Sequence, residues 1–301
     1  MFNKLLTIVD MQLQSNDPTL ETTAAIDQKF NVNGYFSRIG FSGRREPVLE
    51  TLRSIHLLHA QTIPFENLNP FLRVPVELNI DLLYQKLVLN KRGGYCFEHN
   101  LLLAEVLKTL GFKVRGLGAR VLWNVPEGIV TPRGHMLLLV EIDQDYFIAD
   151  VGFGGMTLTA PLLLRPDLSQ KTPHEDFRLI QSDDEYILEA KVMGTWKRVY
   201  RFGLHEQFLV DYEVSSWYLS NHPTSHFVTG LIAALPFEKG RHALRNNEFA
   251  THYLDGSHER KRFDSVVDLR SALEKTFGIK LPAIDSLSSD LERIIQMPTK
   301  K

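Results

Sequence analysis

The spacing of apolar residues in this 301-residue chain changes once, near residue 112, and that change limits the folds it can adopt. Before it, apolar residues recur three and four apart, as on one face of a helix, over 48–58, 80–89 and 96–110. After it, short runs rich in Val, Leu and Ile lie between glycines and polar turns, which is typical of strands. Helices followed by strands disfavour alternating βαβ units. We therefore expect an α+β protein.

The β-rich part ends in a mixed region. Val214–Leu219 indicates a helix or a crossing segment, Asp255-Gly256 a hairpin turn, and Val266–Thr276 a helix that ends near Gly278. The chain thus divides into about three units after a separable polar start. The strands that we expect cover Lys113–Trp123, Met136–Ile142, Tyr146–Val151, Phe177–Ile180, Tyr186–Val192 and Trp196–Phe202.

Composition excludes several classes of protein. The 34 basic and 36 acidic residues give a net charge of −2, which indicates neither a nucleic-acid nor a membrane partner. A hydrophobic fraction of 44% excludes a disordered chain. No run approaches the ~18 apolar residues of a membrane span. The start, MFNKLLTIVDMQL, contains Asp10 and no small-residue cleavage site, so it predicts an accessory helix or a loose extension rather than a signal peptide.

The chain has a single cysteine, Cys96, which excludes an internal disulfide and any multi-thiolate metal site. We expect no metal centre and a reducing, cytoplasmic location. Gly93 and Gly94 precede Cys96 and permit a sharp entry into the helix that it opens, where free N–H groups favour a thiolate. Arg92 adds a nearby cation. Two interpretations stay open from spacing alone: a nucleophile, or an inert buried thiol.

His135 and Asp150 lie at the ends of two predicted strands joined by a turn at 143–145. A two- or four-residue loop around Gln144 makes paired positions sum to 287, so His135 faces Gly152 and Asp150 is its diagonal neighbour on the same face. A three-residue loop would place Asp150 on the opposite face. An unpaired carboxylate in this apolar strand would be costly. The alternative is a carboxylate solvated at the strand end.

Together, Cys96, His135 and Asp150 offer a nucleophile, a base and a carboxylate that orients the base. The same set occurs in cysteine-protease-like and transglutaminase-like folds, and it performs acyl transfer through a thioester. A thiol hydrolase would use the same residues. A binding or redox-sensing module would need the thiol alone.

The surrounding segments resemble the arylamine N-acetyltransferases, most closely the bacterial members. The resemblance runs from about Gly34 to Phe227 and excludes residues 1–30. Four motifs in the same order make it specific, where each alone would be weak. They are RGGYCFEHN at 92–100, IPFENLNP at 63–70, PRGHMLLLV at 132–140 and IADVGFGG at 148–155.

The resemblance implies a helical bundle, a β-barrel-like domain and a smaller α/β lid. It also implies a ping-pong reaction, in which acetyl-CoA acetylates the cysteine and an arylamine, arylhydrazine or N-hydroxyarylamine takes the acetyl group. Acetyl-CoA is then a co-substrate, and no cofactor is tightly bound. An amide synthase is a related alternative. The implied domains are an extension at 1–30, the bundle at 31–112, the barrel at 113–214, and an interdomain segment with the lid at 215–301.

The resemblance also assigns residues, starting with Cys96, His135 and Asp150 as the catalytic set. It implies a supporting contact between Glu66 and Arg92. Many members have a hydroxyl residue where this chain has Gly134. Glycine has no side chain to bond coenzyme A, so the contact implied at this position is one of the backbone. The implied substrate-binding residues are Phe65, Phe153 and Phe227. The implied coenzyme-binding residues are Gly134, Gly152, Gly154, Gly155 and Ser225.

The remaining candidate residues, four histidines and one basic run, do not predict a metal site or another functional site. His56 and His59, three apart on a predicted helix, lack a third metal ligand nearby and are expected to be solvated. His222 and His226 are separated by Pro223, which argues against one helix aligning them. The run 258–262 predicts a solvated hairpin end.

Overall fold

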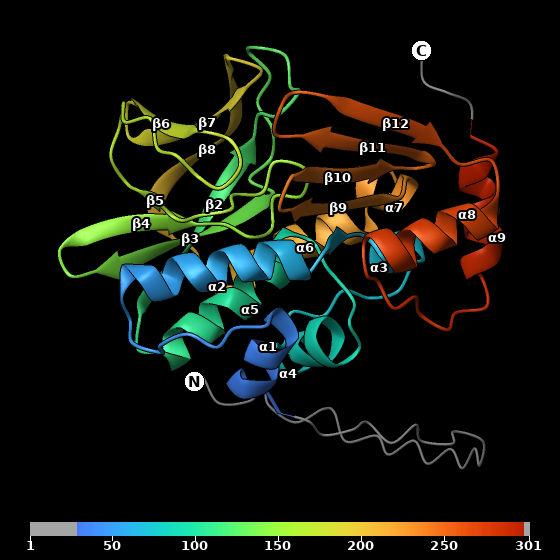
Figure 1. The fold of residues 1–301 in the computed structure, drawn as a ribbon, viewed down its shortest axis with the longest axis horizontal. Helices are drawn as coiled ribbons and strands as arrows, with labels where there is room; N and C mark the ends of the chain where they lie inside the picture. The colour runs from blue at the N-terminus through green and yellow to red at the C-terminus, as the bar shows by residue number, and fades with distance from the viewer. Residues whose placement is uncertain (1–28, 298–301) are drawn as a thin grey trace, which may run out of the picture.

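The computed structural model describes residues 29–297, so the predicted extension at 1–30 lies outside the described residues apart from its last two. Helices from the first third of the chain lie beneath two antiparallel sheets, a larger one of seven strands and a smaller one of five (Figure 1). The α+β class expected from the sequence is confirmed. Within 29–297, no helix has both the length and the apolar character that crossing a membrane requires.

The three helical segments predicted in the first third are present, and two short helices that were not predicted, at 32–39 and 68–71, occur beside them. The segment predicted at 96–110 forms α5 (Cys96–Thr109), which is as long as α2 (Leu49–Thr62). Gly111, at φ +87°, lies directly after α5 and donates its N–H to Lys108 O at 2.9 Å, which ends the helix. The segment predicted at 80–89 is helical throughout, with a π-helical second half. These elements are α1 (Val32–Ile39), α2 (Leu49–Thr62), α3 (Leu68–Phe71), α4 (Ile80–Tyr84), η1 (Gln85–Leu89) and α5 (Cys96–Thr109).

The larger sheet has the order β5-β4-β3-β2-β8-β7-β6 and is a nearly closed barrel. Two isolated bridges, Pro166 with Leu179 and Gln170 with Phe177, join the segment after β5 to β6 and so narrow the gap between the edge strands. One sheet face encloses an apolar core that includes Leu117, Leu137 and Ile148. The strands are β2 (Lys113–Val121), β3 (His135–Ile142), β4 (Asp145–Ala149), β5 (Leu162–Leu163), β6 (Phe177–Ser182), β7 (Glu185–Val192) and β8 (Thr195–Glu206).

The register between β3 and β4 is the predicted one. Leu138 pairs with Ala149 and Ile142 with Asp145, so paired positions sum to 287 across a two-residue turn. Asp143 in that turn adopts φ +55°, a conformation that Asp tolerates better than most residues. His135 and Asp150 therefore share the face that Leu137 and Ile148 present to the barrel core.

The smaller sheet has the order β1-β9-β10-β11-β12, and its first strand comes from the helical part of the chain. The pairing of Phe65 with Ala234 ties that part to the C-terminal third, which the sequence did not indicate. The domain bounds stay a prediction. The elements are β1 (Phe65–Glu66), β9 (Ile232–Phe237), β10 (Gly240–Arg245), β11 (Glu248–Tyr253), β12 (His258–Arg262), α8 (Val266–Ser271), η2 (Ala272–Thr276) and α9 (Leu287–Ile295).

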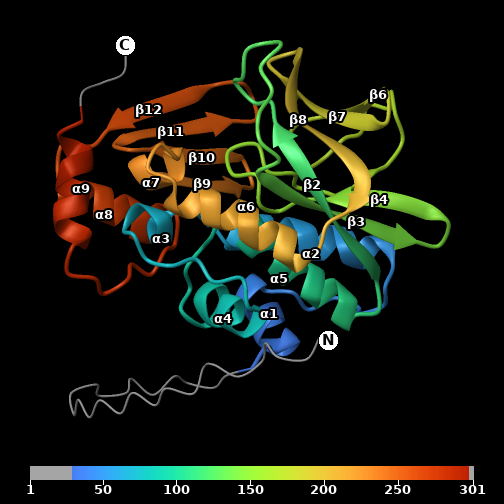
Figure 2. The same cartoon turned by 180° about the vertical axis from the view of Figure 1, so that it is seen from behind.

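Between the sheets run α6 (Leu209–Asn221) and α7 (His226–Thr229). Figure 2 shows α6 on the face of the molecule opposite to α2. The predicted segment Val214–Leu219 is thus the middle of a helix. The chain leaves the helical conformation between α6 and α7, as expected from Pro223. Residues 258–262 form the exposed strand β12, which agrees with the expected solvated hairpin end.

We predict that Leu103→Ala destabilises the protein by about 2–5 kcal/mol, because this fully buried leucine packs in the core that α5 shares with its neighbours. Urea unfolding followed by circular dichroism measures the change. Leu82→Ala is the matched control, since that helical leucine is 46% exposed and its loss should cost less than about 1 kcal/mol. Equal costs would contradict the assigned core.

Candidate active site

The fold brings Cys96, His135 and Asp150 together from three elements. Cys96 is the first residue of α5, His135 is the first of β3, and Asp150 follows β4 directly. All three are buried, with exposed fractions of 4%, 3% and 0%. The Cys96 sulfur lies 3.8 Å from the carbonyl oxygen of Gly134, the residue before the histidine. The three side chains that the sequence singled out therefore share one site.

His135 and Asp150 form a buried ion pair, with Nε2 and Oδ2 2.7 Å apart. Burial alone would lower the pKa of His135, but the Asp150 carboxylate and the adjacent Cys96 overcome it and raise that pKa to about 10. Burial would raise the pKa of Asp150, and the His135 charge holds it below its usual value instead. Because Nε2 faces Asp150, Nδ1 remains for the Cys96 sulfur.

Asn100, which the sequence reasoning missed, connects the three elements. Its side-chain amide donates to Asp150 Oδ1 at 3.0 Å and to Met136 O at 2.7 Å. Gly152 N–H donates to the same carboxylate oxygen at 2.9 Å, and Asp150 N–H donates to His56 Nε2 at 3.1 Å. A signal was present, since Asn100 stands one helical turn after Cys96 on the same face. Both oxygens of the carboxylate thus have hydrogen-bond donors within the protein.

Aromatic rings lie next to His135 and in the apolar cluster that contains Cys96. The ring of Phe153 lies 5.1 Å from that of His135, edge to face. The rings of Phe65 and Phe227 lie 6.1 Å apart, and Tyr95 stands edge-on to Phe227 at 5.5 Å. Phe65 and Phe227 belong to the same apolar cluster as Cys96. The site therefore has flat, apolar walls.

The turn after Asp150 is shaped by its glycines. A Cβ on Gly152 would lie 2.7 Å from Cys96 Cα, and one on Gly154, at φ +87°, would lie 3.3 Å from the Phe65 ring. Gly155 has open space around it. Only glycine at 152 lets this turn approach Cys96 so closely.

Comparison with known proteins identifies the family. A family model described as N-acetyltransferase matches residues 48–286. An arylamine N-acetyltransferase of Mycolicibacterium smegmatis is 43% identical over 255 residues, covering 83% of this chain and 92% of that protein. The chain belongs to the arylamine N-acetyltransferase family.

Two further relatives extend the comparison. An arylamine N-acetyltransferase / N-hydroxyarylamine O-acetyltransferase of Salmonella typhimurium is 37% identical over 250 residues, covering 82% of this chain and 88% of that protein. The structure of the Mycobacterium marinum arylamine N-acetyltransferase in complex with CoA matches with a TM-score of 0.85 at 38% identity, covering 88% of this chain and 99% of that one. The fold expected from the resemblance is therefore the fold of this family.

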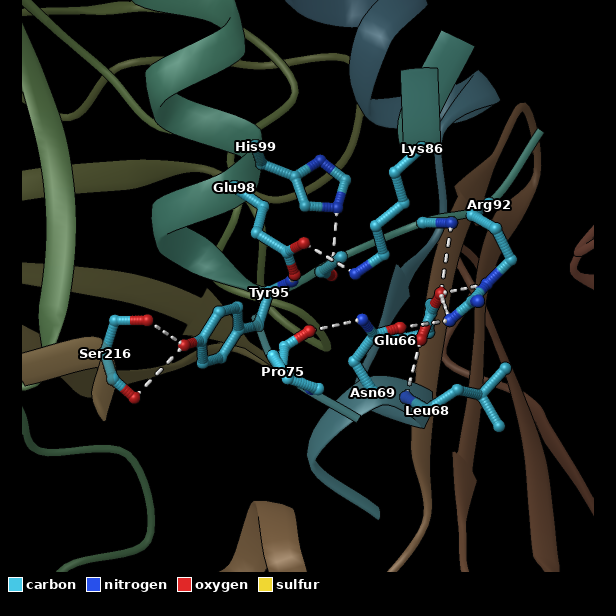
Figure 3. Close-up of polar contacts among 12 residues, drawn as sticks. Glu66, Leu68, Asn69, Pro75, Lys86, Arg92, Tyr95, Glu98, His99 and Ser216 are labelled. Carbon is cyan, nitrogen blue, oxygen red and sulfur yellow. Dashed lines mark hydrogen bonds and ion pairs between the residues drawn. The ribbon is translucent and has the colours of Figure 1, made fainter. Parts of the chain in front are cut away.

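The contact between Glu66 and Arg92 that the family resemblance implied is present (Figure 3). Arg92 Nη2 and Glu66 Oε1 lie 2.8 Å apart, and both side chains are buried. Glu66 also accepts N–H bonds from Leu68 at 2.6 Å and Gly93 at 3.3 Å. Burial raises the pKa of Glu66, but the charges of Arg92 and Lys86 leave it lowered. The pair joins β1 to the turn before Cys96.

Ser225 uses its hydroxyl within the protein. Its Oγ donates to Leu219 O at 2.5 Å and accepts Phe227 N–H at 3.3 Å, which caps α7. Gly134 lies against Leu219, where a Cβ would be 3.4 Å from that side chain. Contacts of both residues with coenzyme A stay predictions.

The expectation of solvated histidines on α2 is wrong, because His56 and His59 are fully buried. His56 lies four residues after the buried Leu52, and His59 lies three residues after His56, so both are on the buried face of α2. Polar partners make their burial acceptable. His59 bonds the Tyr35 hydroxyl at 2.8 Å and His99 Nδ1 at 2.9 Å. Burial lowers the pKa of His56 to about 4, so it stays neutral. No cluster of three metal-ligating side chains occurs in the described residues.

We predict that His135 titrates near pH 10 and that Asp150→Asn moves this midpoint downward, because only Cys96 then opposes the effect of burial. Nitrogen NMR of the imidazoles measures both, and His135→Gln assigns the signal among the 11 histidines. Circular dichroism verifies that the variants fold. A wild-type midpoint near 6.5 would contradict the pairing.

We also predict that Gly152→Ala destabilises the protein by about 1–3 kcal/mol and slows alkylation of Cys96, since the added methyl group must displace the backbone of α5. Gly155→Ala, where the methyl group meets nothing within 4 Å, should change stability by less than about 0.5 kcal/mol. Thermal unfolding and iodoacetamide kinetics measure these effects. Identical behaviour of the two variants would contradict the close approach.

Proposed function

We propose that this protein transfers an acetyl group from acetyl-CoA to arylamines, arylhydrazines or N-hydroxyarylamines through a thioester on Cys96. The observation that carries the proposal is the buried arrangement of one thiol, an imidazole and a carboxylate at the start of α5. Family membership supports the reaction, the name of the Salmonella relative supports N-hydroxyarylamines, and the M. marinum complex supports coenzyme A.

In the first half-reaction, the Cys96 thiolate attacks the acetyl carbonyl of acetyl-CoA and the bond to the coenzyme sulfur breaks. The His135 imidazolium gives its proton to the departing thiolate, so coenzyme A leaves as a thiol. The Cys96 charge helps to keep that proton on His135, and acylation removes this charge. The proton is thus released at the step that needs it.

In the second half-reaction, the amine nitrogen attacks the thioester and the bond to Cys96 breaks. Neutral His135 accepts the proton that the nitrogen loses, and the ion pair of imidazolium and thiolate is restored. Asp150 acts throughout by fixing the ring and stabilising its charged form. A free thiol nucleophile requires reducing conditions, for which we propose the cytoplasm.

We further propose how the substrates contact the site. Three rings near the thiol and the imidazole offer apolar walls for a flat amine, namely Phe65, Phe153 and Phe227. A second group of residues, around the glycine-rich turn after Asp150 and the open space at Gly155, is proposed to contact the pantetheine and phosphates of coenzyme A. This second group comprises Gly134, Gly152, Gly154, Gly155 and Ser225.

We predict that wild-type protein incubated with acetyl-CoA gains one acetyl group on Cys96, that an arylamine removes it, and that Cys96→Ala gains none and loses transfer activity by at least ~10³-fold. Intact-protein mass spectrometry detects the adduct. A hydrolase would discharge it into water without an amine, and a redox-sensing module would form none. An amide synthase would discharge it only to an amine tethered to the donor.

A further inference from the structure

Lys86 occupies an unusual place in the backbone. It lies in η1, the π-helical turn that follows α4 and leads into the loop before Cys96. Single π-helical turns are rare and are often found at functional sites. Its ammonium lies 2.5 Å from Glu98 Oε1, and the two side chains are 16% and 2% exposed (Figure 3). A half-buried lysine paired with a buried glutamate two residues after Cys96 is not explained by the reaction steps above.

Lys86 and Glu98 hold the loop before Cys96 at both ends. At its start, the backbone carbonyl of Lys86 accepts the Arg92 N–H at 3.1 Å. At its end, Glu98 Oε2 accepts the Tyr95 N–H at 3.1 Å, which forms the carboxylate half of a capping box at the N-terminus of α5. The ion pair therefore connects the residue at the start of the loop with the residue that caps α5 at its end.

Glu98 also stands close to Cys96 in the chain. It lies in the same first helical turn, where a negative charge opposes a thiolate. Burial raises the pKa of Glu98, the charge of Glu66 adds to this, and Lys86 and the Tyr95 N–H act against it. Without Lys86, the charge of the Glu98 carboxylate would be uncompensated.

The other charged groups at this turn do not replace Lys86. Arg92 is paired with Glu66, and Glu66 also accepts the N–H groups of Gly93 and Leu68. His99, one turn into α5, stays neutral because burial lowers its pKa to about 4. The His135 charge, on the other side of Cys96, is held by Asp150.

We propose that Lys86 is a positioning residue for Cys96: its ammonium neutralises Glu98 and fixes the loop, so that the sulfur stands ionised at the helix start facing His135. This inference rests on the proposed role of Cys96 as the nucleophile. It adds Lys86 and Glu98 to the residues on which acyl transfer depends, although neither touches the reacting atoms.

The test is the rate of iodoacetamide alkylation as a function of pH, which reports one site because the chain has one cysteine. Lys86→Met keeps the aliphatic stem and removes the charge. It should move the pH midpoint of alkylation upward by about one unit, which lowers the rate about tenfold at a pH below both midpoints. Lys86→Arg should retain the wild-type profile. Lys86→Met combined with Glu98→Gln should restore most of it, since the uncompensated carboxylate is then gone.

Lys113→Met is the matched control, because it breaks an ion pair with Glu141 whose lysine is 77% exposed, and it should change nothing. A wild-type profile in folded Lys86→Met, or a double variant as slow as the single one, would overturn the proposal. If Lys86→Met alone fails to fold, the double variant is compared with the wild-type protein, and a midpoint about one unit higher in the double variant would overturn the proposal. Alkylation needs no acetyl-CoA, so normal alkylation results together with no acetyl transfer would reject the proposed function and leave this proposal standing.

Discussion

The ion pair between His135 and Asp150 is the interaction on which the rest of the site depends. Burial alone would neutralise each partner, and each keeps its charge because the other lies 2.7 Å away. The pair exists only because the turn between β3 and β4 sets a register that places both on the barrel side of the sheet. Asn100 then joins the same carboxylate to α5, and so fixes the thiol relative to the imidazole.

This pair also links the site to stability. The His135 pKa is raised, so its contribution is complete below 6.5 and is lost as the pH rises through about 10. The Asp150 pKa is lowered, so its contribution is complete above 3.8 and is lost as the pH falls. Both contributions are therefore present near neutrality. The pairs of Glu66 with Arg92 and of Lys86 with Glu98 extend the same rule, that each buried charge at the helix start has a partner.

Much of this could be predicted from the sequence where a local rule applied. The change in apolar spacing gave the helical and β-rich parts, and turn length gave the register that unites His135 with Asp150. No local rule predicts contacts between segments that are separated along the chain, such as the pairing of β1 with β9 or the ion pair of Lys86 with Glu98. His56 and His59 were misjudged because spacing marks the buried face of a helix but does not reveal a buried polar partner.

The central claim is that Cys96 carries the acetyl group between two separate half-reactions. The most direct measurement is rapid-mixing detection of free coenzyme A after acetyl-CoA is added without any acceptor amine. A burst of coenzyme A that is stoichiometric with the protein, followed by a slow steady rate, is the predicted result. Release of coenzyme A only when an amine is also present would contradict the account.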